Sequence, residues 1–171
     1  MDGRSGSGKS TLAKSIADTV GGVIVVSDDF YCGGDDDKWE GYSPQAKVAE
    51  VIDWKRLRTQ VLEPLLAGKP ASWHPLAFEP GRGWTGWKSA TVTVRPARVI
   101  ILDGAYSARP ELADIIDLSV LVEAPDEIRR ERLRAREGEP VMKRWHQIWD
   151  PAEDYYFSQV RPPSSFDLVV R

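Results

Sequence analysis

An eight-residue glycine pattern near the start of the chain constrains the fold more than any other feature. Residues 3–10 read Gly-Arg-Ser-Gly-Ser-Gly-Lys-Ser and match the phosphate-binding pattern G-x-x-x-x-G-K-[ST] at every position. Glycines allow a tight turn whose N–H groups point inward, and the helix that follows favours the charge of a phosphate at its amino end. Lys9 is expected to reach the β- and γ-phosphates, and the Ser10 hydroxyl to ligate Mg²⁺. A glycine-rich turn that merely caps a helix is the less favoured alternative. Nucleotide contacts are predicted for these residues of the loop: Gly3, Ser5, Gly6, Ser7, Gly8, Lys9, Ser10 and Thr11.

Apolar periodicity beyond the loop predicts strands that alternate with helices. Helices are predicted over residues 9–20, 54–66, 110–116, 125–137 and 141–159. Strands are predicted over residues 23–26, 91–94, 99–102, 118–122 and 166–170. Pro64 is expected to kink or shorten the second helix, and Pro151 to interrupt the last one. Two stretches, 27–44 and 70–89, are expected to be long loops. The pattern is typical of an α/β fold with a mostly parallel sheet and helices on both faces.

Composition narrows the class of protein. The 171 residues suit one domain, and 42% hydrophobic with 29% charged residues are ordinary for a globular protein. A single cysteine, Cys32, excludes an internal disulfide framework and a cysteine-built zinc site. A net charge of −3 gives no basic footprint for nucleic acid, and the apolar runs are shorter than the ~20 residues of a membrane span. We therefore expect a cytoplasmic domain without nucleic-acid or membrane partners.

Aspartates follow two of the predicted buried strands. Asp28 and Asp29 come directly after residues 23–26, and Asp103 ends the strand at 99–102. Ligand sites of parallel sheets lie at the carboxyl ends of the strands, so these acids are expected beside the phosphate-binding loop. Asp28 or Asp29 could accept a proton from an acceptor hydroxyl or hold a water on Mg²⁺, and Asp103 could orient Mg²⁺. The alternatives are that Asp28 and Asp29 cap a turn or helix, and that Asp103 marks an ordinary strand-to-turn boundary. The run 35–37 is interpreted as a solvated loop.

A helix rich in arginine is predicted over residues 125–137. Phosphoryl transfer spreads negative charge over the transferred group, and arginine side chains stabilise that charge. Arg132 and Arg136 are four residues apart and share a face, so they are the candidate catalytic arginines. Gly138 and Pro140 follow and suit a mobile flap, which places a lid at about residues 129–145. The alternative is a solvated helix with intrahelical ion pairs.

The remaining histidines and tryptophans are less specific. His74 and His146 do not form a metal pair in sequence, and each is interpreted as structural or as a polar substrate contact. Trp39, Trp84 and Trp87 fall in the two long loops, where they could form an aromatic wall for a ring-shaped substrate or pack in the core.

The order of these motifs resembles the uridine kinase-like branch of P-loop small-molecule kinases, which includes phosphoribulokinase, bacterial pantothenate kinase and nicotinamide riboside kinase. Residues 3–11 are similar to its phosphate loop, residues 27–31 (Ser-Asp-Asp-Phe-Tyr) to its Asp-x-Phe-Tyr signature, and residues 129–136 to its lid. The segment from 52–54 to 68–70 resembles the part that leads to the family's P-x-Y-D-F element. Here that element reads Pro-Leu-Ala-Phe at 75–78, without tyrosine or aspartate, and Asp103-Gly104 replaces a Glu-Gly element.

The resemblance implies a three-layer P-loop kinase fold with a mobile lid, built as a single domain over residues 1–171. It also makes Asp28 the candidate base and Tyr31 a candidate substrate contact. Asp29 and His74 are further predicted substrate contacts. The family's first strand should precede Gly3, so a short segment before residue 1 is expected to be missing.

These patterns together predict an ATP-dependent phosphotransferase that acts, with Mg²⁺, on a hydroxyl of a small molecule, with a nucleoside such as uridine as one candidate. ATP is favoured over GTP because no Asn-Lys-x-Asp string is present. The alternatives are a kinase for another metabolite or an antibiotic, a regulatory NTPase, and a module that only binds nucleotide.

Overall fold

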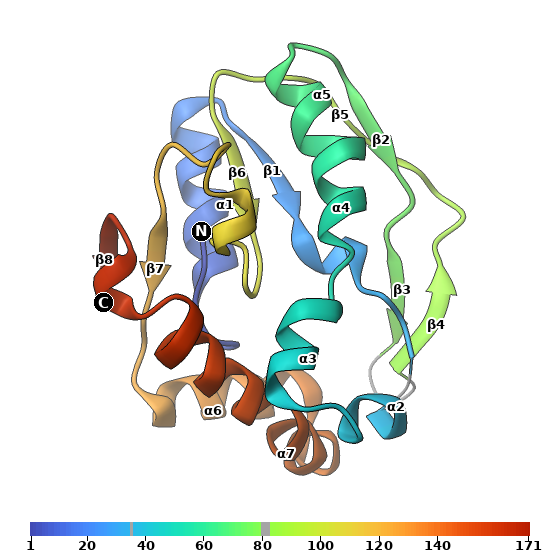
Figure 1. Cartoon of the computed structure of the whole chain (residues 1–171), viewed down its shortest axis with the longest axis vertical. Coiled ribbons are helices and arrows are strands. Elements are labelled where there is room, and N and C mark those ends of the chain that lie inside the picture. Colours follow the sequence, from blue (N-terminus) through green and yellow to red (C-terminus); the bar gives the residue numbers. More distant parts are fainter. Residues whose placement is uncertain (35, 80–82) are drawn as a thin grey trace.

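The computed structural model (Figure 1) contains two pairs of parallel strands. It describes residues 1–34, 36–79 and 83–171, excluding the side chains of 36, 78, 79, 83, 84 and 139–142. β1 (Val23–Val26) pairs with β6 (Ile100–Asp103), and β7 (Val120–Val122) pairs with β8 (Leu168–Val170). The alternating α/β pattern and the parallel pairing predicted from the sequence are confirmed. Val26 is opposite Asp103, so β1 and β6 end at the same level.

The first two residues of the chain lie between the two strand pairs. Asp2 forms a parallel bridge to Leu121, with 2.8 Å hydrogen bonds from its N–H to Val120 O and from Val122 N–H to its carbonyl. The amino group of Met1 donates to Leu102 O at 2.6 Å. Beyond Met1, a groove of 330 Å³ separates β6 from β7, and Val99, Ile115 and Leu118 are among the apolar residues that line it. The expectation of a strand before residue 1 stays a prediction.

Helices cover both faces of β1 and β6. α1 (Lys9–Val20) packs Ala13 and Ala17 against Ile101 on one face and ends at Gly21, whose φ of 66° closes the last turn. On the other face, Val25 and Leu102 join a larger core with Leu57 and Tyr156. The alternation of strand side chains between these two cores gives the expected three-layer arrangement.

Two helical segments run through the prolines that were expected to disturb them. α4 (Trp54–Leu57), a π-helical turn (Arg58–Leu62) and α5 (Glu63–Leu66) follow one another directly, so the helix reaches Leu66 despite Pro64. The wider turn just before Pro64 accommodates a residue that has no N–H and whose ring crowds a regular α-helix. α7 (Glu139–Tyr155) likewise contains Pro151, and the predicted interruption there is wrong. The buried ammonium of Lys47 donates to Ile148 O at 3.0 Å, which helps to hold this part of α7.

The two expected loops contain regular structure. The prediction of a loop over 70–89 is wrong, because β2 (Ala71–Trp73) pairs with β5 (Val92–Val94) and β3 (Leu76–Glu79) pairs with β4 (Gly83–Trp87), both antiparallel. The first stretch holds a 3₁₀ turn (Ser27–Phe30) and α2 (Asp36–Glu40), and α3 (Pro44–Glu50) starts at its end, capped by the Ser43 hydroxyl. The loop predicted for 35–37 is therefore wrong from Asp36 onward, because Asp36 and Asp37 begin α2, but Asp37 is exposed to solvent as predicted. Asp35 lies outside the described residues.

The remaining elements lie close to their predicted positions. The helix expected over 110–116 shortens to a 3₁₀ turn at Pro110–Leu112. α6 (Asp126–Glu137) follows β7, and a π-helical segment (Tyr156–Val160) extends α7. Figure 1 shows β7 and β8 on one side of the molecule and the β2–β5 strands on the other, with α3, α6 and α7 along one end. No helix in the described ranges is long and apolar enough to cross a membrane.

Candidate active site

The phosphate-binding loop forms a tight turn that packs directly against α6. Gly3, Gly6 and Gly8 have φ values of 151°, 79° and 99°, which side-chain-bearing residues rarely adopt. A Cβ atom on Gly6 would lie 2.6 Å from the carbonyl oxygen of Arg129, so only glycine permits this approach. Gly8 is the N-cap of α1, and Lys9 and Ser10 form its first turn. The turn therefore leads directly into a helix amino end, which suits the negative charge of a phosphate. The N–H groups of Gly3, Ser5 and Ser7, by contrast, already donate within the chain.

A buried carboxylate that the sequence did not single out supports the loop from behind. Glu153 on α7 is 2% exposed, and its Oε1 accepts a 2.9 Å hydrogen bond from Ser5 N–H. Burial raises the pKa of Glu153, while the Ser5 hydrogen bonds and Arg129 oppose that shift. Arg129 donates to Ser5 O at 2.7 Å and so ties α6 to the same residue. In the sequence, Glu153 is marked only by its place on a helix near the apolar residues Ile148 and Ala152, which hinted that it is buried.

The two strand-end aspartates meet beside the loop, as the sequence predicted. Asp28 follows β1 and Asp103 ends β6, and a Cβ atom on Gly104 would lie 1.9 Å from Ser27 Oγ and 3.2 Å from Asp28 Oδ1. The Asp28 residue is exposed in part, yet desolvation by the surrounding protein raises the pKa of its carboxyl group. Lys9 opposes this shift, and Asp103 reinforces it. Asp28, Asp103 and Lys9 thus act electrostatically on one another in a single site.

This edge suits a magnesium ion bound together with a nucleotide. Asp103 is 3% exposed, and its Oδ1 has no hydrogen-bond partner in the described part of the chain, which is unusual for a buried carboxylate. No group of three or more His, Cys, Asp or Glu side chains there is arranged to hold a metal alone. Mg²⁺ normally takes one or two carboxylates together with phosphate oxygens and waters. Asp103, with the hydroxyl of Ser10, fits that requirement.

The two candidate arginines of α6 differ in their present contacts. Arg132 Nη1 lies 3.1 Å from the carbonyl oxygens of both Gly6 and Ser7, directly over the phosphate-binding loop. Arg136 is one turn further on and donates to Glu137 at 2.6 Å. Both the expected contact with the loop and the alternative intrahelical pairing therefore occur on this helix.

The second aspartate turns toward the β2–β5 strands. Trp73 Nε1 donates to Asp29 Oδ2 at 2.8 Å, whereas Asp28 faces Lys9. Burial raises the pKa of Asp29, and the Trp73 hydrogen bond, Lys88 and Arg56 oppose that shift. The structure thus gives the two adjacent acids different surroundings: Asp28 lies near Lys9 of the phosphate-binding loop, and Asp29 is bonded to Trp73 of β2.

The other predicted substrate contacts are more peripheral. The Tyr31 ring packs against Trp39 and Trp149, with centroids 5.7 and 6.4 Å away. His74 is exposed, with Nδ1 3.2 Å from Lys88 O.

The other candidates are explained by packing or pairing. Trp39 is fully buried and donates to Gly33 O, so it packs in the core rather than forming a wall. The Trp84 side chain lies outside the described residues, and Trp87 is 45% exposed. His146 pairs with Asp150 on α7 at 2.9 Å.

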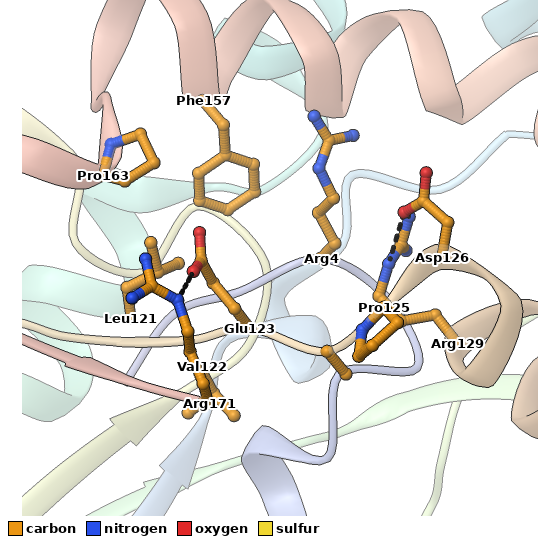
Figure 2. Close-up of a pocket in the computed structure, with 11 residues that line it drawn as sticks. Arg4, Leu121, Val122, Glu123, Pro125, Asp126, Arg129, Phe157, Pro163 and Arg171 are labelled. Carbon is orange, nitrogen blue, oxygen red and sulfur yellow. Dashed lines mark hydrogen bonds and ion pairs between the residues drawn. The ribbon is translucent and has the colours of Figure 1, made fainter.

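A separate cavity of 500 Å³ opens behind the loop (Figure 2). Arg4, Arg129 and Phe157 are among its lining residues, whereas Asp28 and Asp103 are not. Its arginines are paired, Arg4 with Asp154 at 2.7 Å and Arg129 with Asp126 at 2.8 Å. The cavity therefore adjoins the loop without containing the acidic edge.

Comparison with known proteins agrees with this geometry. A family model described as an AAA domain matches residues 2–154. The chain belongs to this AAA-domain family. No curated protein sequence matches this AAA domain significantly.

Two solved structures have a fold similar to that of this AAA domain. A possible uridine kinase from Bacillus stearothermophilus has a TM-score of 0.68 at 21% identity, with 99% of this chain and 85% of that chain covered. A candidate fructose transport system kinase from Silicibacter sp. TM1040 has a TM-score of 0.67 at 23% identity, with 99% and 87% covered. The resemblance to uridine kinase-like P-loop kinases is thereby confirmed at the level of the fold.

Proposed function

We propose that this chain transfers the γ-phosphate of ATP to a hydroxyl group of a small molecule. The observation that carries the proposal is the position of Asp28, which lies beside Asp103 and within the electrostatic reach of Lys9. A carboxylate that faces the phosphate-binding loop is where a base for an acceptor hydroxyl is needed. The kinase names of both structural neighbours are consistent with the proposal.

Each residue of the site has a separate task in this reaction. Asp28 accepts the proton of the acceptor hydroxyl, the hydroxyl oxygen forms a bond to the γ-phosphorus, and the bond to the β,γ-bridging oxygen breaks to release ADP. Lys9 neutralises charge on the β- and γ-phosphates, and the loop N–H groups orient them. Arg132, joined by Arg136 when the lid closes, stabilises the charge on the transferred group. Ser10 and Asp103 would hold Mg²⁺, which would supply further neutralisation of the phosphate charge.

The raised pKa of Asp28 suits the role of base. A carboxylate with a higher proton affinity takes a proton from a hydroxyl more readily, provided that it is still ionised at the working pH. The other members of the site, including Asp29, Tyr31 and His74, are proposed to contact the acceptor. Asp29 is oriented by Trp73, so it can accept a hydrogen bond from a second hydroxyl.

A nucleoside such as uridine is one candidate acceptor, suggested by the possible uridine kinase among the neighbours. A sugar is the second, suggested by the candidate fructose transport system kinase. Leu76 and Ala77 stand in the element where the uridine kinase-like pattern has tyrosine and aspartate, which favours a test of both classes.

The experiment measures ADP release from Mg·ATP with a panel of nucleosides and sugars. Asp28→Asn is expected to lower kcat by about 10²–10⁴-fold while ATP still binds. Lys9→Ala is expected to weaken ATP binding and activity together, and Lys14→Ala is its control, because Lys14 is an exposed lysine of the same helix paired with Asp18. Unchanged activity in Asp28→Asn would refute the proposal. ATP hydrolysis that no acceptor stimulates would indicate a regulatory NTPase instead.

A further inference from the structure

One arginine beside the acceptor side of the site lies between two aromatic rings. The Arg56 guanidinium, on α4, is 4.6 Å from the centroid of the Phe30 ring and 4.3 Å from that of the Trp87 ring. Phe30 is fully buried and ends the same 3₁₀ turn that carries Asp28. Stacking on ring faces fixes the plane of a guanidinium and leaves its N–H donors directed outward in that plane.

Those donors are poorly used by the protein. Within the described ranges Arg56 makes one side-chain hydrogen bond, a long one of 3.4 Å from Nη2 to Asp29 O. Its Nε is buried without a hydrogen-bond partner, and the nearest carboxylate oxygen, of Asp53, is 4.0 Å away. A buried charged donor without an acceptor is costly and calls for an explanation.

Two other arginines near this helix have close carboxylate partners. Arg58 donates to both carboxylate oxygens of Asp114 at 2.8 and 2.5 Å. Arg109 stacks on Trp54 and donates to both oxygens of Glu111 at 2.9 and 2.5 Å. Stacking of a guanidinium is thus accompanied by a two-point carboxylate partner at Arg109, whereas the carboxylate contact of Arg56 among the described side chains is the 4.0 Å ion pair with Asp53.

Arg56 lies next to the residues proposed to bind the acceptor, so a group of the acceptor could pair with its guanidinium. Its guanidinium touches Asp29 and Phe30, the two residues that follow the proposed base. Lys88 acts electrostatically on the same Asp29 carboxylate, so a second positive charge is near. A guanidinium that is held flat, with only long contacts to the described side chains, is suited to two-point binding of a carboxylate or a phosphate.

We propose that Arg56 binds an anionic group of the acceptor, so that the molecule phosphorylated is a hydroxyl compound that also carries a carboxylate or a phosphate. The proposal rests on the phosphotransferase function given above and narrows its substrate class. Under it, a sugar phosphate or a hydroxy acid is a better acceptor than the neutral sugar or nucleoside with the same hydroxyl groups.

The test compares compounds that differ by one anionic group: ribose 5-phosphate with ribose, and glycerate with glycerol. ADP release is measured for each in wild-type protein, Arg56→Gln, Arg56→Lys and Lys55→Gln. Lys55→Gln is the matched control, because it removes one positive charge from the adjacent, exposed position of the same helix. Circular dichroism checks that each variant is folded.

An anionic member of a pair is expected to show a kcat/KM at least about tenfold above that of its neutral partner in wild-type protein. Arg56→Gln is expected to lower the value for the anionic compound by about 10–100-fold, mainly through KM, and to leave the neutral compound within about twofold. Arg56→Lys should recover part of the loss, because it restores the charge without the two-point geometry. Lys55→Gln should match the wild type.

A binding measurement separates this proposal from the function on which it rests. Calorimetric titration with the same four compounds is made while a non-hydrolysable ATP analogue with Mg²⁺ fills the phosphate-binding loop, which would otherwise bind phosphate itself. If the anionic compounds bind through Arg56 but no ADP is released, the function fails and the anion site stands. If neither anionic compound binds more tightly than its neutral partner, or if Arg56→Gln affects both equally, the inference is overturned.

Discussion

Replacing Asp2 by asparagine tests how the phosphate-binding loop is anchored to the sheet. The Asp2 carboxylate is fully buried and accepts four hydrogen bonds. Oδ1 accepts from the N–H groups of Gly3 and Tyr106 at 2.8 and 3.1 Å. Oδ2 accepts from Ala108 N–H at 3.0 Å and from the Tyr156 hydroxyl at 2.7 Å. In asparagine one of these oxygens becomes an NH₂ group, which donates and cannot accept.

The cost follows from which oxygen is replaced. The NH₂ group is expected at the Oδ2 position, because the Tyr156 hydroxyl can rotate and accept there, whereas both groups at Oδ1 are backbone donors. Ala108 N–H then loses its acceptor, which costs about 1–3 kcal/mol. Burial raises the pKa of Asp2, so removing the charge returns part of its desolvation cost. We expect a net loss of about 2 kcal/mol, or a fall in Tm of roughly 4–8 °C for a chain of this length.

Thermal unfolding followed by circular dichroism at neutral pH measures this loss, and urea unfolding checks it. Tyr156→Phe is the matched control: it removes one donor and leaves the carboxylate with three, so it should cost only about 1 kcal/mol. The reasoning is refuted if Asp2→Asn melts within about 1 °C of the wild type, or if Tyr156→Phe is the more damaging change.

Three further predictions concern the acidic edge and α6. Because the pKa of Asp28 is raised, the kcat/KM–pH profile should lose activity on its acidic side at a pH above the usual aspartate range. Ser27→Ala should move this acidic limb to still higher pH, because the Ser27 hydroxyl opposes the pKa shift. A limb that moves to lower pH would contradict this. Gly104→Ala places a Cβ atom 1.9 Å from Ser27 Oγ and should lower the free energy of unfolding in urea by at least about 1–3 kcal/mol. Wild-type stability would show that the segments after β1 and β6 can move apart at no cost. Arg132→Gln should lower kcat by about 10²-fold or more, whereas the exposed Arg130→Gln should not, as ADP release would measure; equal effects would remove the specific role of Arg132.

The proposed nucleotide half of the site was more predictable from sequence than the proposed acceptor half. The phosphate-binding loop is continuous in the chain, and α1 was predicted with its observed bounds, because its spacing and glycines are local signals. Asp28 and Asp103 are far apart in sequence, yet parallel strands bring their ends to one edge by rule. Glu153 could not be found in this way, because its role depends on how α7 folds back onto the loop.

The strands β2, β3 and β4, together with Arg56, show why the rest was missed, whereas β5 falls within the strand predicted over 91–94. Strands of three to five residues, with glycines within them and prolines between them, leave too little alternation to recognise. The strand β2 is defined by its pairing with β5, which brings Ser72 and Thr93 together. Arg56 looks like any exposed helical arginine in the sequence. Its surroundings come from Phe30 on a turn and Trp87 on a distant strand, and only the folded chain brings these together.

The proposed lid and the acidic edge belong to different pairs of strands. β7 leads into α6, and α7 leads toward β8, whereas Asp28 follows β1 and Asp103 ends β6. Amide hydrogen exchange of α6 and α7 can therefore be compared with that of the ends of β1 and β6. Faster exchange of the helices would mean that the arginines of α6 move while the acidic edge keeps its shape.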